Sequence, residues 1–440
     1  MPMEAFALVN ESNKQGRASF TFAMLAPGIL VAATGVGAGD LLTASIAGSV
    51  VGMSILWAAP VGAILKYFLT EGVARWQMAT GTTLLEGWAT RFGPWWQWIF
   101  LGYLVLWSFF VGGALVSACG LAATGLLPLG EDLRTSKAVW GIVHSVAGYC
   151  LVRIGGYRLF EKMMSAMIGL MFVTVILTAF LMRPDWSVVL RGCLVPAIPE
   201  KGTGWLIGIL GGVGGTVTLL SYGYWIREKG RNGMAGLGAS RIDLGVGYLM
   251  TAMFGFAMVM IGSRVSIEKG PTVALELAGQ LELILGPPGR WIFLFGFWGA
   301  VFSSLLGVWQ SVPYLFADLT GLIGRQRGRS GDRGRDEGAS SSAEIVRLSG
   351  TRAYSRFLLG ITVIPLCLLW ISVQQVQLVY AMVGAFFMPL LALSLLIMNN
   401  RVAWVGASFR NGRIANSALV ATLLFFAYVA VREVAKAVGG

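Results

Sequence analysis

Apolar segments long enough to cross a bilayer follow one another along almost the whole chain, and no other feature limits the fold as much. A helix that crosses the hydrocarbon core needs about 20 predominantly apolar residues. The sequence contains about eleven such segments, from near Phe22 to near Val431. Charged residues make up only 12% of the chain, whereas soluble domains carry about 25%. We therefore predict an all-α integral membrane protein.

Glycines interrupt the first apolar segment near its middle. Gly35, Gly37 and Gly39 alternate along it, and Asp40 follows directly. Glycine weakens a helix by roughly 1 kcal/mol relative to alanine, so a spanning helix is expected to unwind here. Unwound backbone inside a membrane is tolerated only where it contacts protein or lines a watery cavity. An acid at such a place is a functional hypothesis by default.

The sixth apolar segment contains a similar interruption, with glycines from Gly208 to Gly215 and then Thr216. Glycine-interrupted helices at matching positions of two halves indicate an inverted-repeat transporter with its site at the midplane. The alternative is that the glycines only let helices pack closely. We expect an inverted repeat of five plus five helices in which helices 1 and 6 are broken.

The placement of positive charge predicts the topology. Lysines and arginines gather at alternate ends of the apolar segments, which places the N-terminus in the cytoplasm and the C-terminus outside a cell (inner) membrane.

An insert rich in Arg, Gly and Ser has a composition that could bind RNA or lipid. The favoured interpretation is a disordered cytoplasmic loop, and no nucleic-acid partner is expected. The predicted parts are a cytoplasmic tail (1–20), a first repeat with helices 1 to 5 (21–182), a second repeat with helices 6 to 10 (203–399) that contains the disordered basic insert (324–350), and an extra helix 11 (400–440).

Residues for catalysis or for a bound cofactor are scarce. The sequence contains no serine–histidine–acid arrangement, paired carboxylates or histidine cluster, so we predict that the protein is not an enzyme and has no cofactor. Its one histidine, His144, is interpreted as a packed residue with satisfied hydrogen bonds. The four cysteines lack zinc-ligand spacing and are interpreted as small buried apolar side chains.

Glu71 and Arg75 are four residues apart in the second apolar segment, so they can pair on one face of a helix. One interpretation is an ion pair that steadies an inner gate. The other is an ordinary pair at the membrane interface.

These motifs resemble the Nramp family of divalent-metal transporters. The resemblance lies in Ala26-Pro27-Gly28 followed by Gly37-Ala38-Gly39-Asp40, in Glu71-Gly72-Val73-Ala74-Arg75 followed by Ala79-Thr80-Gly81, and in the glycine-rich sixth segment. The resemblance implies a LeuT-like fold with an ion bound where helices 1 and 6 are unwound. It also implies the lipid bilayer and the transported ion as partners.

The family's signature is altered in this chain. The first-helix Asp-Pro-Gly-Asn of the family falls on Gly37-Ala38-Gly39-Asp40, so an acid stands where the family has Asn. The sixth-helix Met-Pro-His falls on Thr218-Leu219-Leu220, and the third-helix stretch from Trp107 to Gly113 has no acid. A thioether selects soft metals, whereas oxygen ligands suit hard cations such as magnesium. The expected substrate-binding residues are Thr34, Gly37, Asp40, Thr43, Gly215, Thr218 and Ser221, with Asp40 as the metal ligand.

The sequence leaves several alternatives open. Asp40 is also a good N-cap, a role that would occupy its carboxylate. Half-helix N-termini favour an anionic group, so the solute could instead be a small organic anion. A third possibility is a receptor or scaffold that does not transport, whose site would be plugged by Leu219, Leu220 and Phe387.

Overall fold

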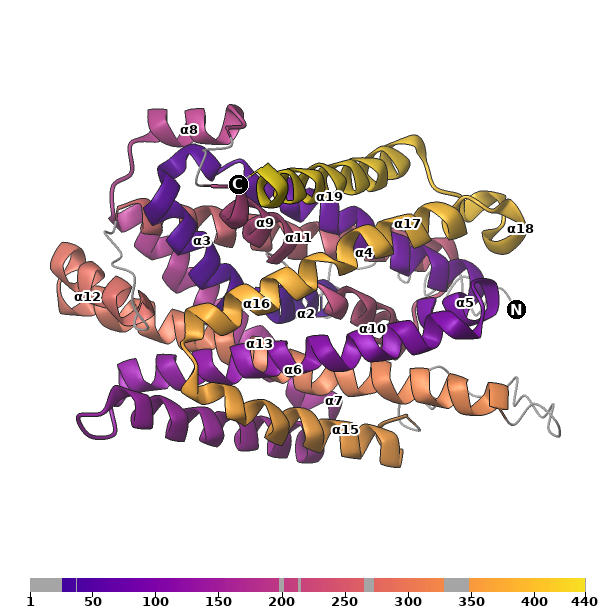
Figure 1. Cartoon of the computed structure of the whole chain (residues 1–440), viewed down its shortest axis with the longest axis horizontal. Helices are drawn as coiled ribbons and strands as arrows, with labels where there is room; N and C mark the ends of the chain where they lie inside the picture. Colours follow the sequence, from indigo (N-terminus) through magenta and orange to yellow (C-terminus); the bar gives the residue numbers. More distant parts are fainter. Residues whose placement is uncertain are drawn as a thin grey trace, which may run out of the picture.

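A computed structural model describes residues 26–36, 38–197, 202–212, 215–264, 273–327 and 348–439. Every regular element within these ranges is a helix, and most helices run along the long axis of the molecule (Figure 1). Within the described ranges, six helices are long and apolar enough to cross a membrane, or up to seven if the bent pair Thr43–Ile55 and Ala58–Thr80 forms one span. The predicted all-α membrane class is confirmed, while the number of eleven spans stays a prediction.

The helices fall into two series, before and after residue 198. The first series is α2 (Ala26–Gly35), α3 (Ala38–Val51), η2 (Gly52–Ile55), α4 (Ala58–Thr80), α5 (Leu84–Arg91), α6 (Pro94–Leu126), α7 (Leu133–Leu181) and α8 (Trp186–Leu194). The second series is α9 (Thr203–Gly212), η3 (Val217–Leu220), α10 (Ser221–Glu228), α11 (Gly233–Ser263), α12 (Val273–Leu285), α13 (Pro287–Arg327), α15 (Arg352–Val363), η4 (Ile364–Trp370), α16 (Val373–Ala385), α17 (Phe387–Asn399), α18 (Val402–Val405), η5 (Ala407–Phe409) and α19 (Arg413–Gly439).

Both glycine clusters coincide with boundaries between helical elements. Helix α2 ends at Gly35 and α3 begins at Ala38, while α9 ends at Gly212 and η3 begins at Val217. Gly37 and residues 213–214 lie outside the described residues. Each of the two segments therefore consists of two helical pieces.

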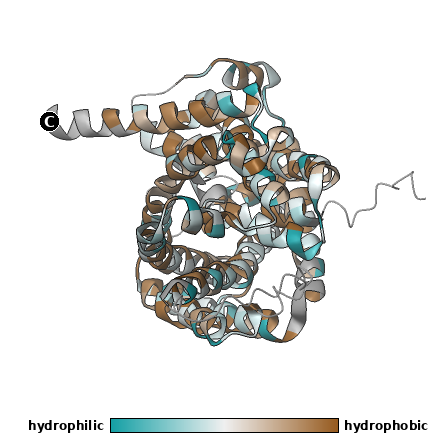
Figure 2. Ribbon diagram, turned by 90° about the vertical axis from the view of Figure 1, so that its right-hand side faces the viewer, coloured by the Kyte–Doolittle hydropathy of each residue, from teal (hydrophilic) through white to brown (hydrophobic). Residues whose placement is uncertain are grey.

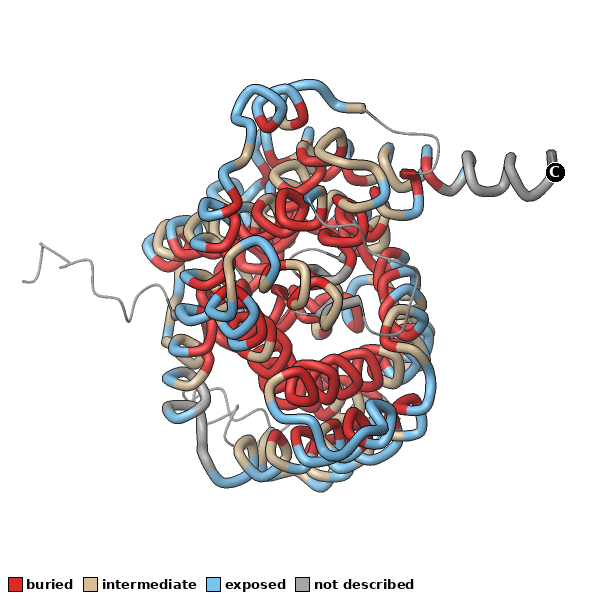
Figure 3. Tube along the Cα trace, turned by 90° about the vertical axis from the view of Figure 1, so that its left-hand side faces the viewer, coloured by how far each residue is buried: buried red, intermediate tan, exposed pale blue. Residues whose placement is uncertain are grey.

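Apolar side chains occupy both the interior and the outer surface. Buried chain forms the middle of the bundle (Figure 3), while apolar residues also cover outward-facing turns (Figure 2). Exposed residues such as Leu106, Phe180 and Leu393 suit a surface surrounded by lipid, where apolar contact is not lost. The prediction of buried cysteines is wrong for Cys150 and Cys367, which are exposed on this surface.

Three further differences separate the structure from the sequence-based expectation. Helix α7 runs without interruption for 49 residues where helices 4 and 5 of the first repeat were expected to be separate, because no proline breaks its hydrogen-bond pattern. Helix α13 continues to Arg327 and so includes the first residues of the predicted insert, of which 328–347 lie outside the described residues. The extra segment 400–440 contains α18 and η5 before the long helix α19.

Helix α11 holds both pieces of the first broken helix through close backbone contacts. A Cβ atom at Gly247 would meet the carbonyl oxygen of Gly28 in α2, and one at Gly262 would meet the carbonyl oxygen of Ser45 in α3. Small residues let membrane helices approach this closely, which increases van der Waals contact. These glycines therefore fix the position of α2 and α3 against α11.

We expect Gly262→Ala to destabilise the fold by about 1–3 kcal/mol, because the added methyl group would force α3 away from α11. Gly245→Ala in the same helix is the matched control, since its Cβ meets nothing within 4 Å and alanine favours a helix. Thermal unfolding of the two variants in detergent measures the difference. Equal melting temperatures would contradict the packing argument.

Candidate functional site

The two interrupted segments meet at Gly215 and Gly35. Gly215 has a φ of +84°, a conformation that glycine adopts without strain. A Cβ atom at Gly215 would lie 3.4 Å from the Cα atom of Gly35 and 2.6 Å from the Oγ1 atom of Thr218. The structure thus brings together three predicted site positions, Thr34 next to Gly35, Gly215 and Thr218.

Three buried hydroxyl groups lie next to this meeting point or at the helix that follows it. The hydroxyls of Thr34, Thr216 and Ser221 have no hydrogen-bond partner within the described part of the chain. These residues are 6%, 0% and 0% exposed. A buried hydroxyl without a partner costs about 1–3 kcal/mol, so such groups indicate a place for water or a ligand.

The remaining predicted residues of the first segment lie in or before α3. Because α3 begins at Ala38, Asp40 falls within its first turn and is not the residue that precedes the helix. The N-cap interpretation of Asp40 stays a prediction, and the helix dipole favours an acid in this first turn. The side chain of Asp40 and all of Gly37 lie outside the described residues. Thr43 is buried, with its methyl group against Gly208 of α9.

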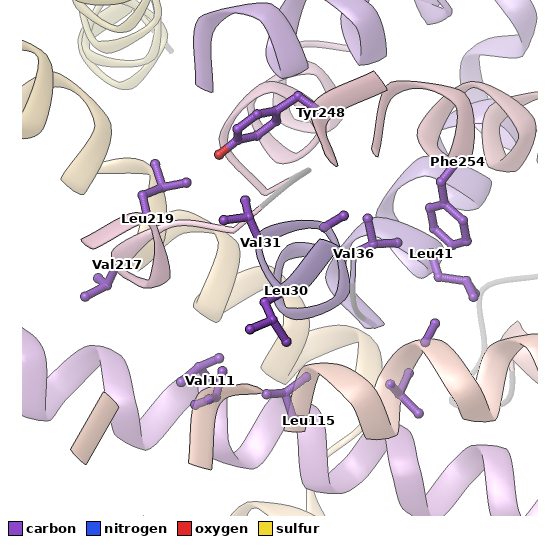
Figure 4. Close-up of a cluster of buried hydrophobic side chains, with 14 of the residues drawn as sticks. Leu30, Val31, Val36, Leu41, Val111, Leu115, Val217, Leu219, Tyr248 and Phe254 are labelled. Atoms are coloured by element: carbon purple, nitrogen blue, oxygen red, sulfur yellow. The ribbon is translucent and has the colours of Figure 1, made fainter. Parts of the chain in front are cut away.

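One backbone carbonyl at the first interruption has a hydrogen-bond partner within the protein. Ser304 of α13 donates a hydrogen bond of 3.1 Å to the carbonyl oxygen of Val36. Figure 4 shows apolar side chains around the same place, including Val31 of α2 beside Leu219 of η3. The hydroxyl groups are thus set in a largely apolar wall.

Of the three side chains predicted to plug the site, two lie in η3 and one lies elsewhere. Leu219 and Leu220 are buried in η3, next to the interruption. Phe387 instead stacks on Tyr103 of α6, with 6.1 Å between the ring centroids.

One buried amide, on the helix that contacts the second interruption, was missed from the sequence. Gln377 of α16 donates from Nε2 to the carbonyl oxygen of Ala114, while its Oε1 has no partner within the described residues. Thr216 packs on Gly384, which is two turns further along α16 on the same face. The signal available in the sequence was a polar residue within an otherwise apolar helix.

Helix α10, which follows the second interruption, is held by polar contacts on two sides. Tyr222 donates a 2.6 Å hydrogen bond to Asp243 of α11, and Tyr224 donates one of the same length to Asp318 of α13. Asp243 also pairs with Arg231 at 2.5 Å. These contacts fix α10 at the end of the bundle that is predicted to face the cytoplasm.

The predicted pairing of Glu71 with Arg75 is confirmed, and it is buried. The Arg75 guanidinium lies 2.5 Å from Oε1 of Glu71, and the same oxygen lies 2.9 Å from Nε of Arg241 in α11. Arg75 also donates to the carbonyl oxygens of Phe409 and Arg410. The pair therefore joins α4 to α11 and to the loop before α19, while its role as a gate stays a prediction.

His144 has partners on both ring nitrogens, as predicted for a packed residue. Its Nδ1 lies 2.7 Å from the carbonyl oxygen of Trp140, and Trp298 donates a 2.9 Å hydrogen bond to its Nε2. Because Nε2 accepts, Nδ1 carries the proton and the ring is neutral.

Comparison with known proteins gives consistent results. The family model described as natural resistance-associated macrophage protein-like matches residues 28–436. An uncharacterized protein of Pasteurella multocida, PM0681, is 26% identical over 61% of this chain and 63% of its own length. The divalent metal cation transporter MntH of Caldanaerobacter subterraneus is 22% identical over 64% of this chain and 68% of its own. A manganese transporter of Eremococcus coleocola, 14% identical, shares the fold with a TM-score of 0.65 over 96% of this chain and 88% of its own.

We expect Glu71→Ala to lower the free energy of unfolding by about 3–5 kcal/mol, because the change leaves the buried guanidinium of Arg75 without its carboxylate. Glu282→Ala is the matched control. It removes a pair with Arg290 whose side chains are 38% and 45% exposed, and such pairs contribute about 1 kcal/mol or less. Chemical denaturation in detergent compares the two variants. A loss for Glu71→Ala no larger than that for Glu282→Ala would refute a structural role for the buried pair.

Proposed function

The chain belongs to the Nramp family, and from this premise we propose that it is a membrane transporter for a divalent cation, with a hard ion such as magnesium as substrate. Transport takes place by alternating access and without obligatory proton coupling. The protein lies in the cell (inner) membrane with its N-terminus in the cytoplasm and its C-terminus outside.

The observation that carries this proposal is a set of unpartnered hydroxyl oxygens on residues that adjoin the contact between the two interrupted helices. Thr34 lies beside Gly35, and Thr216 lies beside Gly215. Asp40, the proposed metal ligand, is in the first turn of α3. One carboxylate with a few hydroxyl oxygens suits magnesium, which keeps several waters and needs few protein ligands.

Two features of the sequence support a hard ion and uncoupled transport. Thr218 stands where the family pattern has methionine, so the site lacks the thioether that favours soft metals. Helix α6, which corresponds to the third helix, contains no Asp, Glu or His between Pro94 and Leu126. A proton path through carboxylates of that helix is therefore absent.

We expect proteoliposomes that contain the purified protein to take up magnesium in a saturable manner and without acidification of the lumen. Asp40→Ala is expected to abolish this uptake, because it removes the proposed metal ligand. Asp185→Ala is the control, since Asp185 is an N-cap residue of α8 outside the predicted site. Fluorescent reporters for magnesium, manganese and pH measure the fluxes. Absence of flux for both metals would overturn the metal proposal and favour a small organic anion or a receptor role.

Thr34→Val tests the hydroxyl groups separately. The hydroxyl of Thr34 has no partner in the described residues, so its loss is expected to leave the melting temperature unchanged or raised. The Michaelis constant for magnesium is expected to rise about fivefold, which corresponds to one hydrogen bond of about 1 kcal/mol.

Thr178→Val is the control for this substitution. Thr178 is also buried, but its hydroxyl donates to the carbonyl oxygen of Thr174 at 2.8 Å. The control is expected to lose stability and to keep its Michaelis constant. A Thr34→Val variant that loses stability while its Michaelis constant stays unchanged would show that the hydroxyl is structural.

A further inference from the structure

A small internal cavity lies beside α10, and the proposed site for the divalent cation does not include it. Its volume is about 10 Å³, which is close to the least that one water molecule needs. Polar residues of its wall are Gln77 of α4, Thr83 at the N-cap of α5 and Tyr224 of α10. Leu220 of η3 and Leu315 of α13 contribute apolar surface. The cavity is therefore a separate place that can hold one small particle.

Gln77 supplies an oxygen without a partner at this cavity. The residue is 6% exposed, and its Oε1 has no hydrogen-bond partner within the described residues. A Cβ atom at Gly223, which is also part of the wall, would lie 2.6 Å from this oxygen. A buried amide oxygen without a partner costs about 1–3 kcal/mol. Such an oxygen indicates a ligand or a water molecule in the cavity.

The other polar side chains of the wall have lone pairs to offer, and their protons are already used. The hydroxyls of Tyr224 and Thr83 donate to the same carboxylate oxygen of Asp318, at 2.6 and 3.0 Å. Thr83 also accepts a hydrogen bond from the backbone N–H of Glu86. A hydroxyl has one proton and two lone pairs, so each of the two oxygens keeps at least one lone pair. The wall thus offers acceptors, which suit a cation.

The charge near the cavity has the sign that favours a cation. Asp318 is buried, and its carboxylate lies one hydrogen bond behind the hydroxyls of Thr83 and Tyr224. Hydrogen-bonded groups polarise one another, so a hydroxyl that donates to a carboxylate is a stronger acceptor. The guanidinium of Arg227 lies 3.9 Å from the carboxylate of Glu86, and these opposite charges offset each other.

We propose that this cavity binds one monovalent metal cation, such as sodium, through Oε1 of Gln77 and the hydroxyl oxygens of Thr83 and Tyr224. The small volume requires the ion to enter without a full shell of water. Magnesium gives up its waters reluctantly, and the cost of burying an ion rises with the square of its charge. A single charge is therefore favoured where the nearest ligands are neutral oxygens.

An ion in the cavity connects three elements at the end of the bundle that is predicted to face the cytoplasm. Gln77 belongs to α4, Thr83 is the N-cap of α5 and Tyr224 belongs to α10. A ligand that binds the folded state stabilises it by mass action. Sodium would thus hold α10 against α4. This site goes beyond the proposed transport of a divalent cation and does not depend on it.

The experiment measures the melting temperature of the full chain in lipid nanodiscs while sodium chloride replaces N-methylglucamine chloride at constant ionic strength. A chelator removes divalent metals, and N-methylglucamine is the reference cation because it is too large for the cavity. We expect the melting temperature to rise with sodium and to reach a plateau.

Gln77→Met removes the amide oxygen and is expected to weaken the apparent affinity for sodium by about tenfold, as for loss of a bond to a charged group. Without sodium this variant is expected to melt no lower than the unmodified chain, because Oε1 has no partner in the described residues. Gln77→Glu is expected to bind sodium about tenfold more tightly, since it places a charge at the same position. Gln375→Glu is the matched control, because it adds the same charge at an exposed residue of α16 outside the cavity.

The proposal is overturned if sodium and N-methylglucamine give the same melting temperature, which would mean that the cavity holds only water. It is also overturned if Gln77→Met keeps the full response to sodium. Gln77→Glu covers the case in which Gln77→Met fails to fold, and an affinity no higher than that of Gln375→Glu would count against the site. Magnesium uptake without a sodium response would refute only this inference, whereas a sodium response that depends on Gln77 without metal uptake would refute only the magnesium proposal.

Discussion

Backbone groups that leave a helix inside a membrane must find partners in the protein, and the centre of this fold is arranged around that requirement. In the first broken helix, Ser304 supplies one such partner, because its hydroxyl donates a hydrogen bond to the carbonyl oxygen of Val36. The second adopts a positive φ at Gly215 and lies directly against Gly35. The two interruptions are therefore in contact, so a ligand held by one is next to the other.

Charged groups are distributed unevenly along the bundle. At the end predicted to face the cytoplasm, buried acids are paired with arginines, as in Glu71 with Arg75 and Arg241 and in Asp243 with Arg231. Burial removes water from both partners of an ion pair, and close, well-aligned contact between the two charges offsets that cost. These pairs join α4, and the turn that follows α10, to α11 at that end.

Near the interruptions, charge is sparse and polarity comes mainly from hydroxyl groups. Thr34, Thr216 and Ser221 contribute oxygens that both donate and accept hydrogen bonds. Such groups are compatible with a hydrated cation and with an anion. The charge that favours a cation in the proposed site is that of Asp40, in the first turn of α3.

The sequence by itself determined the membrane class, both glycine interruptions and the pairing of Glu71 with Arg75, because each depends on residues that are neighbours along the chain. Helical periodicity alone places two residues four positions apart on one face. Only the tertiary structure decided that Arg241, 170 residues from Glu71, joins that pair. It also decided that Gly35 lies against Gly215 and that Gln377 of α16 bonds to the carbonyl oxygen of Ala114 in α6. These contacts depend on how whole helices pack, and local sequence does not specify which face of a uniformly apolar helix meets which neighbour.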